Sequence, residues 1–215
     1  MTRMSDDALH QGGALSTALD DGDLARAKIY ALLGSLFYHA PSSELLRIVA
    51  SDSVICNDEA DSDFCRAWRA LQQAAAKIDA ETVTDEFDAA FIGTGRQPVM
   101  LYGSFYEAGF LHEKPLAWLR EDLKKMGFAR LGDRHESEDH VSALCDVMRF
   151  LIEGDAATPP AALALQRDFF RRHIQPWYAN LANAVVSANQ TDFYKHAAQL
   201  LREFFVVEDT AFEMS

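Results

Sequence analysis

Apolar residues recur along this chain at the spacing of an α-helix, and this periodicity restricts its fold more than any other feature. Between Asp23 and Ala40 they fall three and four positions apart, on one face of a helix. Similar stripes follow, down to a final helix from about Asp192 to Val206. No Asn-Gly or Asp-Gly pair is flanked by alternating apolar residues, as a β-hairpin requires. The sequence therefore predicts a single all-α globular domain of roughly eight to ten helices.

Helix-breaking and helix-capping residues divide the periodic stretches. Pro41 ends the first helix and Ser42–Ser43 begin a second. The Thr82 hydroxyl is expected to cap a later helix. We expect three parts: a flexible N-terminal lead-in over residues 1–22, a helical domain over 23–207, and a short C-terminal tail over 208–215.

A segment in the middle of the chain departs from helical periodicity. Residues 93–109 combine glycines, a proline and bulky aromatic side chains, which predicts a long aromatic loop. Long loops in compact domains often carry function. The aromatic side chains could fill the core, which is the usual position of Phe and Tyr. They could also line a peptide-binding groove, and beside acidic residues they would suit a ligand with apolar and arginine-rich parts.

The charge of the chain restricts its partners. There are 33 Asp and Glu against 20 Lys and Arg, a formal net charge of -13. Nucleic-acid binding and docking on anionic lipid both depend on clustered basic side chains, so the composition argues against both. The excess of acid favours a cationic partner; the alternative is an acidic surface that serves solubility alone.

The cysteines and the N-terminus favour a cytoplasmic protein. Cys56, Cys65 and Cys145 are odd in number and lack a metal-binding spacing, so we expect three free thiols packed as small apolar side chains. Residues 1–23 contain no apolar stretch typical of a signal peptide. No run approaches the roughly 18 apolar residues that a membrane-spanning helix needs. We therefore expect a soluble protein of the cytoplasm.

A run of polar residues, Glu136–His140, precedes a long apolar helix. If the run is helical, Glu136, Asp139 and His140 project from one side, because residues three and four apart are neighbours. One interpretation is a capping cluster, with carboxylates at the positive end of the helix dipole. The other is a polar site that receives a cationic ligand. In the first case Asp139→Ala destabilises the fold, and in the second it weakens ligand binding at a nearly unchanged melting temperature.

Signatures of enzymes are missing from the chain. Helical bundles bind di-iron through paired Glu-x-x-His motifs, and no such pair is present, so we expect no metal site. The phosphate-binding motifs GxxxxGK[ST] and GxGxxG and the hydrolase motif GxSxG are also missing. We expect no catalytic residue and no bound cofactor.

Four segments, in order, resemble the TorD/DmsD family of redox-enzyme maturation chaperones, and most closely its DmsD branch. Residues 32–41 resemble the end of the family's first helix, and residues 87–93 with 101–106 resemble its central aromatic segment. Glu136–His140 matches the signature Glu-Pro-x-Asp-His, with Ser137 in place of the proline. Residues 173–177 (HIQPW) resemble the family's His-x-x-Pro-Trp segment.

The resemblance implies an all-helical, non-catalytic chaperone of the cytoplasm. Such chaperones bind the twin-arginine signal peptide of a molybdopterin-containing oxidoreductase and delay its export until the cofactor is inserted. Tyr102 and Tyr106 stand where the family has tryptophans, and Phe87 replaces a nearby one. The resemblance carries signal-peptide binding over to Tyr38, Phe87, Tyr102, Gly103, Ser104, Tyr106, Asp139 and His140, with Glu136 as a supporting acid.

Several alternatives stay open at this point. The principal rival is a carboxylate-bridged metal enzyme built in a helical bundle. Guanine-nucleotide binding, proposed for relatives of the family, and a purely structural helical adaptor are the others. The partners implied are the signal peptide and a folded or partly folded molybdoenzyme subunit, while the identity of that client stays open. The chain itself would be a monomer or a domain-swapped dimer that exchanges helices near residues 127–136.

Overall fold

The computed structural model describes residues 19–53, 55–56, 61–93, 97–129 and 136–214. Within these residues the chain forms ten α-helices and one π-helical segment, and it has no strand beyond an isolated bridge between Tyr102 and His140. The all-α prediction is confirmed. The elements are α1 (Asp21–Tyr38), α2 (Ser43–Ser51), α3 (Asp63–Ala75), α4 (Ala80–Phe87), η1 (Asp88–Ile92), α5 (Gly103–Ala108), α6 (Lys114–Lys125), α7 (Val141–Glu153), α8 (Leu163–His173), α9 (Tyr178–Ser187) and α10 (Phe193–Glu213).

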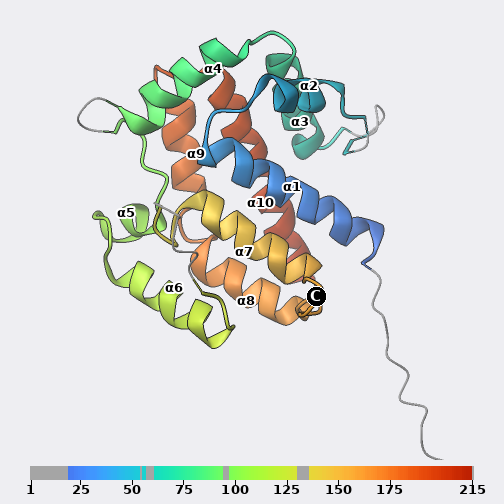
Figure 1. Cartoon of the computed structure of the whole chain (residues 1–215), viewed down its shortest axis with the longest axis vertical. Coiled ribbons are helices and arrows are strands. Elements are labelled where there is room, and N and C mark those ends of the chain that lie inside the picture. The colour runs from blue at the N-terminus through green and yellow to red at the C-terminus, as the bar shows by residue number, and fades with distance from the viewer. Residues whose placement is uncertain (1–18, 54, 57–60, 94–96, 130–135, 215) are drawn as a thin grey trace, which may run out of the picture.

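Helices α1 and α7 pack side by side at the centre of the molecule (Figure 1). Helix α10 packs against α9 and α3, and α8 packs against α7. The predicted apolar stripe of α1 enters this core: Ile29, Leu33, Leu36 and Phe37 are buried, and Leu32 is partly buried against it. No helix among the described residues is long and apolar enough to cross a membrane.

Helix α10 runs farther than the sequence pattern indicates. It ends at Glu213, so the boundary expected at residue 207 falls inside a helix. Glu208 is 1% exposed and accepts hydrogen bonds from Arg26 Nε at 2.7 Å and from the Tyr30 hydroxyl at 3.0 Å. Helix α1 likewise begins at Asp21, inside the expected lead-in, whose residues 1–18 lie outside the described residues.

Two local predictions need correction. Asp79 caps α4 in place of Thr82, because the Asp79 carboxylate accepts the Thr82 backbone N–H at 2.8 Å. The expected long aromatic loop over residues 93–109 is not irregular throughout, since its residues 103–108 form helix α5. The proposed exchange hinge near residues 127–136 lies largely outside the described residues.

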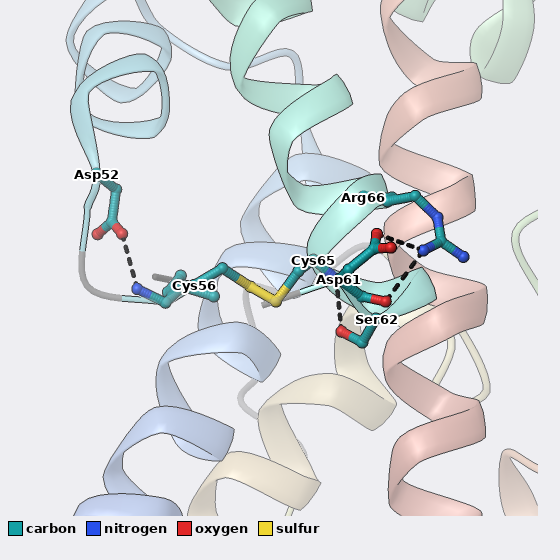
Figure 2. The surroundings of a disulfide bond; sticks show 7 residues. Asp52, Cys56, Asp61, Ser62, Cys65 and Arg66 are labelled. Carbon is teal, nitrogen blue, oxygen red and sulfur yellow. Dashed lines mark hydrogen bonds and ion pairs between the residues drawn. A yellow bond between two sulfur atoms is a disulfide. The ribbon is translucent and has the colours of Figure 1, made fainter. Parts of the chain in front are cut away.

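A disulfide joins Cys56 and Cys65, so the expectation of three free thiols is wrong (Figure 2). Cys56 lies in the connection between α2 and α3, and Cys65 lies in the first turn of α3. Their Cα atoms are 5.7 Å apart, a distance that a disulfide spans without moving the backbone. The separation of nine residues matches no recognised cysteine motif, and an odd cysteine count does not prevent two of three from pairing. Cys145 is free and buried, as expected.

We predict that Cys56→Ser lowers the free energy of unfolding by about 2–3 kcal/mol. Closing a loop of this length removes conformations from the unfolded chain, and that restriction is lost in the variant. Urea denaturation without reductant measures the difference. In a thiol reductant, the variant and the wild type should unfold at the same urea concentration. Equal stability without reductant would contradict a stabilising disulfide.

Candidate functional site

Two neighbouring cavities lie where α1 ends. The larger, of about 500 Å³, lies beside α6 and α7, and we call it the α6–α7 groove. The smaller, of about 30 Å³, is lined by residues of α1, α4, η1 and the segment that precedes α5. Tyr38, Glu136 and His140 line both cavities, so these side chains mark the place where the two adjoin.

Apolar side chains of α7 form one side of the α6–α7 groove. Ala143, Val147 and Phe150 recur four and three positions apart, on one face of the helix. The ring of Phe128, which follows α6, meets the ring of Phe150 edge to face, with centroids 5.1 Å apart. None of these residues is among the predicted site residues, although their helical spacing beside the buried stripe of α7 is a signal that could have found them. Leu123 and Ala129 add to the apolar lining.

The same groove carries acidic side chains. Glu136, Glu138 and Asp146 are among the described residues that line it, together with Arg120 and Arg149. Arg120 pairs with Glu138 at 2.8 Å. Arg149 instead pairs with Glu153, at 2.9 Å along its own helix. Among the described residues, the lining therefore combines apolar surface with three carboxylates and two guanidinium groups.

Residues 136–140 are not helical, so the shared helical face expected for them is absent. They form a turn, and α7 begins at Val141. His140 precedes the helix and caps it, because its ring Nδ1 accepts the Ser142 backbone N–H at 3.2 Å. This capping geometry explains why the helix starts after the polar run. Glu136 and His140 still reach the groove, whereas Asp139 does not line it.

Asp139 is buried and acts as a structural acceptor. Its Oδ2 atom accepts the Ser104 backbone N–H at 2.9 Å, and its Oδ1 atom accepts the Ser137 hydroxyl at 2.5 Å. Its backbone carbonyl accepts the Gly103 N–H at 2.9 Å. Asp139 therefore does not cap α7, as the capping interpretation expected, and its hydrogen bonds go instead to the first residues of α5. Ser137 supplies a donor that the proline of the family signature lacks.

Tyr102 connects the segment before α5 to the polar run. Its hydroxyl donates a hydrogen bond to Glu136 Oε2, and its ring meets the His140 ring edge to face at 5.0 Å. Its backbone also pairs with His140 in the isolated bridge. Burial and the neighbouring Glu136 carboxylate raise the pKa of Tyr102 above its usual value, so the phenol stays protonated at neutral pH. Tyr102 thus holds the Glu136 carboxylate at the junction of the two cavities.

His140 is neutral at physiological pH. Burial lowers its pKa to about 4, against the opposing effect of the Glu136 and Asp139 carboxylates. An uncharged ring with Nδ1 as an acceptor fits its capping role. His140 therefore contributes polarity and ring surface to the groove and carries no positive charge there.

The other predicted site residues divide into lining and supporting side chains. Phe87 lines the small cavity, and its ring lies 5.2 Å from that of Phe91. Tyr106 donates to the Met100 carbonyl at 2.8 Å and stacks on Trp177 with centroids 5.8 Å apart. A Cβ at Gly103 would lie 2.9 Å from Trp177 Nε1, so the close approach requires glycine. Gly103, Ser104 and Tyr106 line neither cavity.

The described residues of this region offer no cluster of metal ligands. Across the part of the chain that the structure describes, no three His, Cys, Asp or Glu side chains are placed to hold a metal ion together. His140 lines the α6–α7 groove, and its Nδ1 atom already accepts a backbone hydrogen bond.

Comparisons with known proteins identify a family and a similar fold. The family model for the nitrate reductase delta subunit matches residues 57–183, which include Glu136–His140. The fold is similar to the crystal structure of a proposed redox enzyme maturation protein from Archaeoglobus fulgidus, with a TM-score of 0.56 and 20% identity. That alignment covers 93% of this chain and 98% of the other. No curated protein sequence matches the chain significantly.

Proposed function

The chain belongs to the nitrate reductase delta subunit family, the TorD-like family of redox-enzyme maturation chaperones, and we propose that it binds a twin-arginine signal peptide in the α6–α7 groove. The client is a molybdopterin-containing oxidoreductase subunit, held in the cytoplasm until its cofactor is inserted. The role is that of a non-catalytic chaperone of the DmsD branch.

One observation carries this proposal: a single groove combines an apolar wall with several carboxylates. Its volume of about 500 Å³ lies within the range of ligand pockets in proteins. A twin-arginine peptide presents two guanidinium groups followed by an apolar stretch. Carboxylates bind guanidinium through paired, charge-assisted hydrogen bonds, and an apolar wall accommodates the stretch that follows.

The predicted site residues take distinct parts in this proposal. Glu136 and Glu138 receive the arginine side chains, while Tyr38 and the ring of His140 contact the peptide at the junction of the two cavities. Phe87 and Tyr102 shape the small cavity beside it. Gly103, Ser104, Tyr106 and Asp139 act indirectly, by fixing α5 and the turn before α7.

Calorimetric titration with a synthetic twin-arginine peptide tests the proposal. We expect binding that weakens by about tenfold or more when both arginines become alanine, because each charge-assisted hydrogen bond contributes about 1.5–3 kcal/mol. A scrambled peptide of the same composition is the control for net charge. Undetectable binding, or equal binding of the alanine peptide, would overturn the proposal.

Metal analysis separates the proposal from its principal rival, a metal enzyme. Protein purified without chelators should contain less than a stoichiometric amount of any transition metal. One or more bound ions per chain would favour the metal enzyme instead.

A further inference from the structure

An arginine of the protein itself forms an ion pair with one of the carboxylates that line the groove. Arg120, on α6, donates from both Nε and Nη2 to Glu138 Oε2, at 3.0 and 2.8 Å. Glu138 lies in the turn before α7, so the pair joins two segments that line the same groove. The arrangement places a guanidinium group on a groove carboxylate before any ligand arrives.

The Arg120–Glu138 ion pair can separate because its arginine side chain is exposed to water. The Arg120 side chain is 49% exposed, whereas the Glu138 side chain is 18% exposed. Ion pairs with an exposed partner are weak, because water screens the charges and a long side chain loses freedom in the contact. Arg120 can therefore leave for solvent at little cost, while the carboxylate stays in the groove.

We propose that Arg120 is an internal competitor, which holds Glu138 until an arginine of the bound peptide displaces it. This inference rests on the proposed function, in which Glu138 binds an arginine of the peptide, and adds how that carboxylate is regulated. An incoming guanidinium reproduces the paired hydrogen bonds that Arg120 gives up. A lysine ammonium is a point charge and does not reproduce that geometry, so the exchange favours arginine over lysine.

Arg149 provides a matched comparison. It also lines the groove, but its partner, Glu153, lies one turn farther along α7 and is absent from the described lining of the groove. Removing either arginine changes the charge of the groove by the same amount. Only removal of Arg120 takes an ion pair away from a carboxylate of the described groove lining.

Titration of Arg120→Gln and Arg149→Gln with the twin-arginine peptide, at equal ionic strength, tests the inference. We expect Arg120→Gln to bind about two- to fivefold more tightly than the wild type, the range that an exposed ion pair supports. Arg149→Gln should change the affinity by a smaller factor. An unchanged or weaker affinity of Arg120→Gln, or an equal gain in Arg149→Gln, would overturn the competitor role.

A double-mutant cycle with Glu138→Gln adds a second readout. Glu138→Gln should weaken peptide binding, and Arg120→Gln added to it should give no tightening, because the carboxylate with which Arg120 competes for the peptide is gone. A gain of the same size in both backgrounds would overturn the inference. Wild-type protein that binds no peptide would instead refute the proposed function, so the two failures are distinct.

Discussion

Glu208→Ala is expected to lower the free energy of unfolding by about 3–5 kcal/mol. Glu208 lies on α10, and its carboxylate accepts hydrogen bonds from Arg26 and Tyr30 of α1, both more than 170 positions away. Arg26 also contacts Gln166 of α8 at 3.1 Å. The variant would leave the Arg26 guanidinium and the buried Tyr30 hydroxyl without this acceptor, at a junction of three helices.

Urea denaturation measures this effect, with the double variant Arg26→Met, Glu208→Leu as the control. The control should lose less stability than Glu208→Ala, because it leaves no unpaired charge beside the core. Truncation after Val207 should destabilise the chain in the same way as Glu208→Ala. A truncated chain as stable as the wild type would instead support a dispensable tail over 208–215.

Asp139→Ala is expected to lower the free energy of unfolding by about 2–4 kcal/mol. The variant leaves two buried donors, the Ser104 backbone N–H and the Ser137 hydroxyl, without their acceptor, and each such loss costs about 1–3 kcal/mol. Thermal or urea denaturation checks this value. A nearly unchanged melting temperature, with weaker peptide binding, would instead assign Asp139 to the ligand.

Asp139→Asn is the matched control for this prediction. Its amide oxygen can still accept the hydrogen bond from the Ser104 backbone N–H. The Ser137 hydroxyl can rotate so that it accepts a hydrogen bond from the new amide NH₂ group. We therefore expect the asparagine variant to retain most of the stability and to bind the peptide nearly as the wild type does. A large loss of binding in this stable variant would show that the Asp139 charge acts on the peptide.

The helices follow from the sequence because their apolar periodicity is a local property. The stripe of α1 and the start of α2 at Ser42–Ser43 appear in the structure as the pattern predicts. The last turns of α10 do not follow the pattern, since Val206 and Val207 are exposed and the next residue to face the core is Glu208. Glu208 is stabilised there by Arg26, a contact that no local window of sequence contains.

The sequence predicts the candidate site only in part, because the contacts that shape it also join residues that lie far apart in the chain. The motif identified Glu136–His140, but the partner that decides the role of Asp139 lies 35 positions away in α5. The start of α5 depends on that contact, so a loop was the reasonable prediction for residues 103–108. The disulfide and the apolar wall of the groove also depend on how α2, α3, α6 and α7 are placed.

The central claim is that the α6–α7 groove holds a twin-arginine peptide, and photo-crosslinking tests it most directly. The peptide would carry a photoreactive phenylalanine analogue in its apolar stretch, and mass spectrometry would locate the linked residues on the wild-type protein. The account predicts crosslinks within residues 123–129 and 143–150, which are lost when unlabelled peptide competes. Crosslinks confined to α2 and α3 or to α9 and α10 would contradict it.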